Sequence, residues 1–167
     1  GIDNWAHKVA LENNGTTVAI LAHGLDSIFP SRNKPLAEEI IEKNGALVSE
    51  YAIGIKHNKW TFVNRDRIQS GLSLGVFVLE SGLKGGSMHT ADFCNKQQRI
   101  LFALKSSKNI SYQNMEGNIK LLNEGAIPFN EKTDLDTIKS ELNRSDNDLK
   151  EDNTIKKDQQ NSLNAYR

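Results

Sequence analysis

FVNRDRIQSGLSLGVFVLESGLKGGSMHTA, residues 62–91, combines four features in order: a basic segment, an apolar run, a Gly-Ser turn with one lysine, and the start of a helix. The apolar run GVFVLE (75–80) predicts a buried strand, and the turn follows it directly. In an open α/β sheet, ligands bind in the crevice beyond the carboxyl ends of the strands. We therefore expect this stretch to carry the binding site.

The turn has the composition of an anion-binding site. Lys84 is followed by Gly85, Gly86 and Ser87, and such residues at a helix start leave backbone N–H groups free for a phosphate. A lysine there would contact the phosphate as a point charge. The alternatives are a solvated lysine and glycines required only for a tight turn.

Two arginines precede the strand, in a helix predicted over residues 62–72. Arg65 and Arg67 are two positions apart, so they do not share a helix face. We expect one of them, with a slight preference for Arg65, to face the anion while the other pairs with Asp66 or another carboxylate. A surface helix of mixed charge is the alternative.

Composition limits the possible functions. The chain has 167 residues, with 21 basic and 21 acidic side chains, so a polyanion must be bound by a local patch and not by net charge. Cys94 is the one cysteine, which precludes an internal disulfide and favours a reducing, cytoplasmic setting. We expect no signal peptide, and the sequence has no apolar run of membrane-spanning length. We expect a soluble intracellular protein without a membrane partner.

The last part of the chain differs from the rest. Residues 131–167 hold 7 basic and 9 acidic residues, with no Gly, Pro or Trp. Such a segment buries too little apolar surface to offset its ordering entropy. We expect a domain at 1–130 followed by a charged, disordered tail at 131–167. The helical spacing of Leu135, Ile138 and Leu142 predicts a short helix at the start of that tail.

Strands and helices are predicted to alternate along residues 1–130, which is typical of βαβ units with right-handed crossovers. The predicted class is a Rossmann-like α/β fold, a doubly wound and mostly parallel sheet with helices on both faces. Asp3 is expected to cap the first helix, and IPF (127–129) to form an edge strand. The other expected strands are TTVAIL (16–21), ALVSEY (46–51), GVFVLE (75–80) and RILFAL (99–104).

Other candidate residues carry weaker signals. The four histidines and Cys94 have no metal-site spacing, so we predict no metal and no cofactor. Cys94 is expected to be a buried structural thiol and Trp5 a core residue. We expect His23 to be a loop histidine without a chemical role. Carboxylates at strand ends, such as Glu50 and Glu80, could act as acid or base, but no nucleophile–base pair follows from spacing.

Five blocks taken together resemble the DNA-processing protein A (DprA/Smf) family. The resemblance extends from Gly1 to about Phe129. No single block is specific to the family, but the set of blocks in this order is. The blocks are GIDNWAHKVALENNGTTVAILAHGLDSIFP (1–30), NKPLAEEIIEKNGALVSEY (33–51), FVNRDRIQSGLS (62–73), KGGSMHTA (84–91) and GNIKLLNEGA (117–126).

The resemblance implies a Rossmann-like domain that binds single-stranded DNA without enzymatic activity of its own. The family protects incoming strands during natural transformation, helps to load the recombinase RecA and usually forms homodimers. By resemblance, Lys84 belongs to a basic DNA-binding pocket, which the arginine block packs against or lines. The DNA-binding residues expected on this basis are Lys84, Arg65, Arg67, Gly85, Gly86, Ser87 and Asn118.

The chain also departs from the family pattern. The family's upstream strand and its Gly-Ser-Arg phosphate motif have no counterpart here, so the first βαβ unit is expected to be missing. Asp66 stands where the family has asparagine, Gly85 where it has serine, and the asparagine at Asn118 is displaced by one position. Asp66 and the absent Gly-Ser-Arg motif favour a second hypothesis, a sensor or hydrolase of nucleotide derivatives on the same scaffold. A third is an incomplete copy that is inactive alone.

Overall fold

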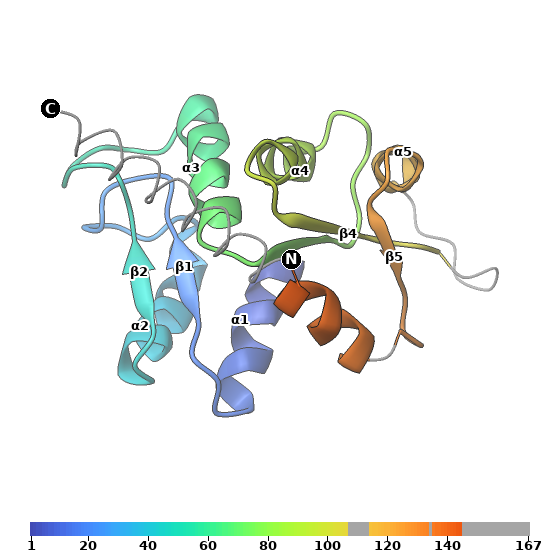
Figure 1. Ribbon diagram of the computed structural model, residues 1–167. Coiled ribbons are helices and arrows are strands. Elements are labelled where there is room, and N and C mark those ends of the chain that lie inside the picture. Colours follow the sequence, from blue (N-terminus) through green and yellow to red (C-terminus); the bar gives the residue numbers. More distant parts are fainter. Residues whose placement is uncertain (107–113, 134, 145–167) are drawn as a thin grey trace, which may run out of the picture. The chain divides into compact units, whose positions relative to one another are not determined.

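The computed structural model describes residues 1–106, 114–133 and 135–144. Helices and parallel strands alternate along these residues, which confirms the predicted α/β class. The chain divides into two compact units, Gly1–Gln69 and Ser70–Arg167. Each unit contains its own parallel sheet (Figure 1).

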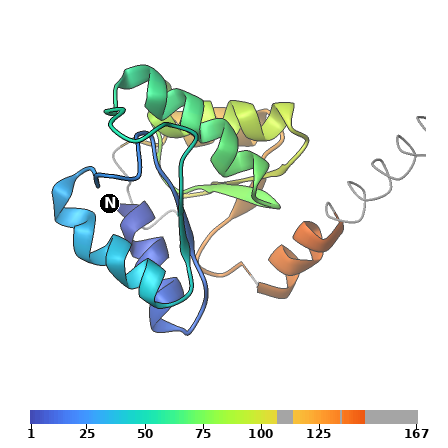
Figure 2. The same cartoon turned by 90° about the vertical axis from the view of Figure 1, so that its left-hand side faces the viewer.

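The first unit is built on a two-stranded sheet. Strand β1 (Val18–Ile20) pairs in parallel with β2 (Ala46–Val48). Helix α1 (Ile2–Glu12) packs against α2 (Lys34–Glu42), which follows the short 3-10 helix η1 (Ser31–Asn33). Figure 2 shows α1 and α2 side by side. The core of this unit consists of Leu11, Leu36 and Ile40, packed with Ala19 and Leu47.

The helices of the first unit end where the sequence predicts. Asn14 and Asn44 adopt positive φ angles of 57° and 61°, the left-handed conformation in which a helix commonly stops. Pro35 lies in the first turn of α2, where its missing N–H costs nothing. The Phe29–Pro30 peptide bond is cis.

Two predictions for α1 are wrong. The residue that caps α1 is Gly1, without a side-chain hydrogen bond, so Asp3 lies within the helix. Trp5 is 60% exposed, and Ile2 and Val9 are exposed as well. The buried residue of this helix is Leu11, which lies at its carboxyl end in contact with α2 residues. The apolar spacing correctly predicted a helix, but the side chains of Ile2, Trp5 and Val9 do not face the core.

Helix α3 (Lys59–Gly71) begins earlier than the predicted Phe62. The Asn58 side-chain oxygen accepts hydrogen bonds from the N–H groups of Trp60, at 2.8 Å, and Thr61, at 3.1 Å. The Thr61 hydroxyl oxygen in turn accepts from the Asn58 N–H at 2.8 Å. This reciprocal capping satisfies N–H groups that a helix start leaves without partners, and it fixes the start of α3 in the segment predicted as a loop.

The second unit contains a three-stranded parallel sheet in the order β3-β4-β5. β3 (Gly75–Val78) leads to α4 (Gly86–Lys96), and β4 (Ile100–Leu104) leads to α5 (Glu116–Asn123). β5 (Ile127–Phe129) pairs only with β4 among the described strands, so the predicted edge strand is confirmed.

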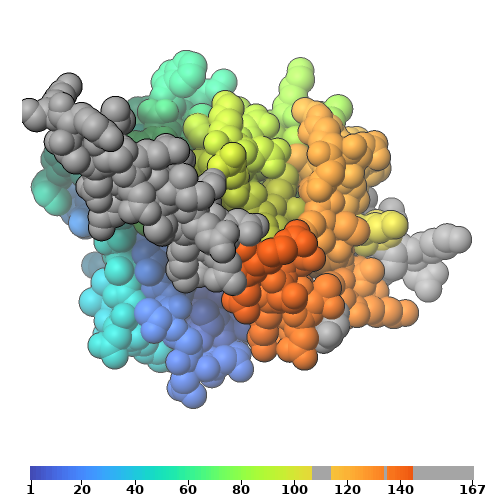
Figure 3. All heavy atoms as spheres, in the orientation of Figure 1, coloured from blue at the N-terminus to red at the C-terminus, as the bar shows by residue number. Residues whose placement is uncertain are grey.

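The two faces of this sheet bury different side chains. One face packs against α4 and α5 through a cluster that includes Val78, Met88, Cys94, Leu101 and Leu121. On the other face, Phe77 stacks on Phe102 at 4.3 Å and meets Phe129 edge-on at 5.3 Å, measured between ring centroids. The alternation follows from the period of two along a strand. Figure 1 shows α4 and α5 next to each other above the strands, and Figure 3 shows the atoms of these two segments side by side on one face.

Residues 135–144 form the predicted short helix. Its Leu142 side chain approaches Gly75, so the packed part of the second unit extends past the expected domain end at 130. In Figures 1 and 2 this helix lies on the sheet face opposite α4. Disorder was predicted for residues 131–167, and of these, 134 and 145–167 lie outside the described residues. Among the described helices, none has the length and apolar character to cross a membrane.

Candidate functional site

The turn at residues 81–87 follows β3 and carries the predicted anion-binding residues. Lys84 is exposed, and no hydrogen bond or ion pair joins it to any residue in the described part of the chain. The Gly85 N–H donates to the Gly82 carbonyl at 3.0 Å. Gly85 also caps α4 without a side-chain hydrogen bond. The first N–H groups of a helix have no partner inside it, so Gly86 and Ser87 present donors at this end of α4.

Gly85 and Gly86 are glycines for different reasons. A Cβ atom at Gly85 would collide with the Ser81 hydroxyl and lie 3.2 Å from the Gly82 carbonyl oxygen. At Gly86 nothing lies within 4 Å of that position. Packing therefore requires glycine at position 85. At position 86 the absence of a side chain leaves the backbone open to a ligand.

Asn118, predicted to bind DNA, is fully buried at 0% exposure. Its side-chain oxygen accepts from the Ser81 N–H at 2.9 Å. Its side-chain nitrogen lies 3.0, 3.1 and 3.3 Å from the carbonyl oxygens of Val78, Leu79 and Leu104. All polar atoms of this side chain are thus used within the protein. The structure assigns Asn118 to holding the ends of β3 and β4 and the start of the turn, and not to contact with a ligand.

Gly117 completes this attachment of the turn to α5. Its N–H donates to the Ser81 carbonyl at 2.8 Å. A Cβ here would lie 2.5 Å from that same carbonyl oxygen and 2.9 Å from the Met88 sulfur. The close approach of α5 to the turn therefore requires glycine. Lys84 is exposed on a turn whose backbone is fixed at both ends.

Two grooves lie beside α5. One, of about 510 Å³, is lined by Lys105 and Ser106 after β4 and by the α5 residues Asn118 and Ile119. The other, of about 390 Å³, lies between Leu83 and the exposed side of α5. Lys105 was not among the predicted site residues. Its place directly after the strand RILFAL is the signal that could have identified it.

Arg65 lies in the first unit, and its guanidinium group donates hydrogen bonds to other groups of the protein. One guanidinium nitrogen donates to the Ile20 carbonyl at the end of β1 at 2.8 Å. Its Nε donates to the Asp66 carboxylate at 3.1 Å. The Arg65 side chain is 21% exposed, and Asp66 is buried. Arg65 therefore connects β1 to α3, and Asp66 neutralises its charge.

Arg67 forms an ion pair with Glu50, which follows β2. This ion pair is more exposed to solvent than the pair of Arg65 with Asp66, because 47% of the Arg67 side chain is exposed. Both arginines of the predicted site thus meet carboxylates in the first unit. The predicted residues in the second unit, from Lys84 to Ser87 and Asn118, are brought together around one turn.

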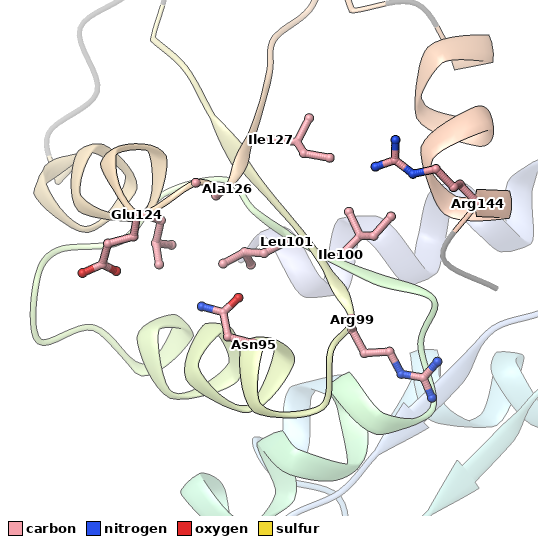
Figure 4. Close-up of a pocket in the computed structure, with 10 residues that line it drawn as sticks. Asn95, Arg99, Ile100, Leu101, Glu124, Ala126, Ile127 and Arg144 are labelled. Carbon is pink, nitrogen blue, oxygen red and sulfur yellow. The ribbon is translucent and has the colours of Figure 1, made fainter. Parts of the chain in front are cut away.

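A further pocket of about 320 Å³ lies at the opposite ends of the strands of the second unit. Figure 4 shows Arg99 and Arg144 with their guanidinium groups apart, and Asn95 and Glu124 on the helix side. Arg99 donates to the Gly71 carbonyl at 2.9 Å. This pocket faces the amino ends of β4 and β5 and the carboxyl ends of α4 and α5, where helix dipoles disfavour an anion.

The remaining candidates have structural roles. Cys94 is fully buried, as predicted, and burial raises the pKa of its thiol to about 11. His23 is buried, and its ring nitrogen Nδ1 lies 2.9 Å from the Gly24 carbonyl. Within residues 1–106, 114–133 and 135–144, no three His, Cys, Asp or Glu side chains are grouped to hold a metal ion.

Comparison with known proteins gives consistent results. The model of the family described as DNA recombination-mediator protein A matches residues 1–140. Protein Smf of Escherichia coli K12 is 42% identical over 135 residues, which cover 81% of this chain and 36% of that protein. The DNA processing protein DprA of Bacillus subtilis is 38% identical over 126 residues, covering 75% and 41%. The chain spans well under half of either relative.

Two solved structures are similar. The X-ray structure of DprA from Streptococcus pneumoniae has a TM-score of 0.68 and 35% identity, over 77% of this chain and 44% of that one. A structure of DNA processing protein A from Helicobacter pylori, described for its single-stranded DNA binding mode, has a TM-score of 0.61 and 25% identity. It covers 89% of this chain and 72% of that one.

Proposed function

The chain belongs to the DNA recombination-mediator protein A family, the DprA/Smf family that its sequence resembles, and we propose that it binds single-stranded DNA at the turn 81–87. The observation that carries the proposal is Lys84, an exposed lysine without a partner in the described residues, on a turn fixed by Asn118. The open backbone at Gly86 lies next to it. The strand binding described for the Helicobacter pylori protein supports the choice of ligand.

The ligand contact takes a specific form. The Lys84 ammonium group binds one phosphate, while the N–H groups at the start of α4 bind the same or a neighbouring phosphate. Lys105, at the end of β4, adds a second cation on the carboxyl side of the sheet. Phosphate contacts of this kind are independent of base sequence and weaken with salt.

The test measures the affinity of the Lys84→Ala variant for fluorescein-labelled oligo-dT by anisotropy at graded salt. Loss of one phosphate contact is expected to weaken binding and to reduce the log–log salt slope by about 0.7. Lys96→Ala, an exposed lysine at the other end of α4, is the matched control and should bind as the unmodified protein does. An unchanged affinity of folded Lys84→Ala would refute the site.

The wider role follows from the family and belongs to the same proposal. The chain acts in DNA uptake during natural transformation and in RecA-mediated recombination, in the cytoplasm and without catalysing a reaction. Recombinase loading onto a coated single strand, measured with and without the chain, tests the RecA part. Labelled oligonucleotide and nucleotides should both be recovered chemically unchanged after incubation.

Self-association is the last part of the proposal. Leu83 and Ile119 are 59% and 57% exposed and line the same groove of about 390 Å³. An exposed apolar pair of this kind supports contact with a second copy of the chain. Ile119→Arg should shift a homodimer to monomer in light scattering coupled to size exclusion. Ile53→Arg, at an exposed isoleucine of the first unit, should leave the mass unchanged.

The hypothesis of a nucleotide-derivative sensor or hydrolase is not favoured, because the relatives are DNA processing proteins. Asp66 had supported that hypothesis as an acid beside the anion site. In the structure its carboxylate pairs with Arg65 within the first unit, so it stabilises that unit's strand-end contacts. A thermal-shift screen with nucleotides would revive the hypothesis if one nucleotide stabilised the chain and oligo-dT did not bind.

A further inference from the structure

The first unit contains both Asn-Gly dipeptides of the sequence, Asn14–Gly15 and Asn44–Gly45. Asparagine is a chemically labile residue, and a following glycine makes it more so, because glycine has no side chain to hinder its own backbone nitrogen. That nitrogen can attack the Cγ atom of the asparagine. A new C–N bond closes a five-membered succinimide ring, and the side-chain nitrogen leaves as ammonia. Water then opens the ring to aspartate or isoaspartate, so the reaction needs no oxidant, reductant or enzyme.

The two dipeptides occupy the same position at the ends of neighbouring helices. Asn14 follows α1 and Asn44 follows α2, with φ angles of 57° and 61°, and both asparagines are exposed. In each case the N–H of the following glycine donates to a helix carbonyl five residues earlier, at 2.8 Å. A nitrogen that donates in this way is not free to attack the side chain, so the hydrogen bond must open before the ring can close. The rate of reaction therefore depends on how readily each turn opens.

Gly45 is held by the strand that follows it. A Cβ atom at this position would collide with the Thr17 carbonyl oxygen and lie 2.7 Å from the Ile40 side chain. The next residue, Ala46, is the first of β2, and its N–H donates to the Thr17 carbonyl at 3.2 Å. The turn after α2 cannot open without disturbing the pairing of β2 with β1.

Gly15 is exposed and has looser surroundings. The three heavy atoms nearest to a Cβ at this position lie 3.0 to 3.7 Å away, and all belong to the Ala10 backbone. Strand β1 begins only at Val18, so Thr16 and Thr17 separate this glycine from the strand. The end of α1 can therefore fray without breaking a strand pair, and fraying ends open at a lower free-energy cost than packed strands do.

We propose that Asn14 is a site of spontaneous deamidation, whereas the packing of Gly45 protects Asn44. Both products place a carboxylate just past the carboxyl end of α1, where the helix dipole disfavours negative charge. Isoaspartate also adds one carbon atom to the backbone, which displaces the Gly15 N–H from its acceptor. Deamidation at this turn therefore lowers the stability of the first unit as the protein ages. The inference concerns this turn alone and does not depend on DNA binding.

The first experiment follows deamidation by peptide mass spectrometry in heavy-oxygen water, for the folded chain and for the chain unfolded in urea. In urea both dipeptides should gain mass at similar rates, because each is the same Asn-Gly pair. In the folded chain Asn14 should react about tenfold or more faster than Asn44, which is the internal control. Equal rates in the folded chain, faster reaction at Asn44, or no reaction at Asn14 would overturn the inference.

Two variants locate the reaction. Asn14→Gln lengthens the side chain, which slows ring closure, and it should abolish the mass gain in its own peptide while Asn44 keeps its rate. Asn44→Gln, the same change at the other helix end, should leave the rate at Asn14 unchanged. Thermal melts establish that both variants are folded. Fragment ions should place the gain at Asn14, and a gain at Asn13, which is followed by asparagine and not by glycine, would contradict the assignment.

Urea denaturation measures the consequence for stability. The deamidated chain carries one more negative charge, so ion exchange separates it from the unmodified chain. Its urea midpoint should be lower than that of the unmodified chain, and an equally aged Asn14→Gln sample should yield no such destabilised fraction. If the separated fraction unfolded at the same urea concentration as the unmodified chain, the modification would not weaken the first unit.

Discussion

Arg65 and Arg67 lie beyond the strands of the first unit with their charges paired to Asp66 and Glu50, whereas Lys84 lies beyond β3 of the second unit without a partner in the described residues. Lys84 was predicted from its place after a strand, whereas Arg65 and Arg67 were predicted from the basic segment that precedes that strand. A basic residue in the predicted stretch is therefore not by itself a binding residue. The distinction depends on which neighbours neutralise the charge.

The largest expected effect concerns the side chain that fixes the Lys84 turn. Asn118→Ala would leave the Ser81 N–H and the carbonyls of Val78, Leu79 and Leu104 without a buried partner. Because each buried polar group left unpaired costs about 1–3 kcal/mol, we expect a loss of about 3 kcal/mol or more in the free energy of unfolding. Urea denaturation measures it.

Asn123→Ala is the control for this change, since Asn123 is exposed on the same helix. It should alter stability by about 0.5 kcal/mol or less. If both asparagine variants had similar stabilities, the turn would not be held as described, and Lys84 would not differ from a lysine on a mobile loop.

The next effect separates Arg65 from Arg67. Arg65→Met leaves the buried Asp66 carboxylate without this partner, and the Ile20 carbonyl loses its donor. We expect a loss of about 2–4 kcal/mol. Arg67→Met breaks the more exposed pair with Glu50 and should cost about 1 kcal/mol or less. Equal losses in urea denaturation would show that exposure does not separate these pairs.

A smaller effect distinguishes Gly85 from Gly86. Gly85→Ala should destabilise the second unit by about 1–2 kcal/mol, since the added methyl group meets Ser81 and the Gly82 carbonyl. Gly86→Ala meets open space and should raise stability by up to about 1 kcal/mol through helix propensity. The same Gly86→Ala protein should bind oligo-dT more weakly if a phosphate approaches this backbone. Thermal melts and anisotropy measure the two outcomes.

The smallest effects depend on pH and differ between the units. In the second unit, burial raises the pKa of Cys94 from 9.0 to about 11. The unfolded chain therefore ionises first, and stability should fall as pH rises from about 9 to about 11. In the first unit, burial lowers the pKa of His7 below 6.5, so stability should fall as pH drops below that value.

Two variants test which side chain causes each change of stability with pH. Cys94→Ala should reduce the fall in unfolding free energy at alkaline pH, and His7→Gln should reduce the fall at acid pH. Each variant should leave the other fall unchanged. If Cys94→Ala retained the fall at alkaline pH, the buried thiol would not be its source.

The elements of the fold could be predicted from sequence because their signals are local. Asn14 and Asn44 end helices at positive φ, and β3, β4 and β5 occupy the predicted apolar runs. Trp5 was misassigned because helical spacing identifies an apolar face but not what covers it. The start of α3 was missed because the cap depends on both Asn58 and Thr61, within a segment of polar and apolar residues.

The site was predictable only in part. Lys84 and its glycines follow one strand, so their place could be inferred from the order of residues. The role of Asn118 depends on contacts with Ser81 and Leu104 that are distant in sequence. The pairing of Arg67 with Glu50 joins two segments in the same way.

The attachment of the turn to Asn118 and Gly117 has a consequence for the thermodynamics of binding. A free loop loses conformational entropy when a ligand orders it, and that loss reduces affinity. Here the backbone from Ser81 to Gly85 is ordered when the protein folds, so little of that entropy remains to be lost when a strand arrives. Substitutions in α5 that never touch the ligand would then weaken binding by restoring the freedom of the turn.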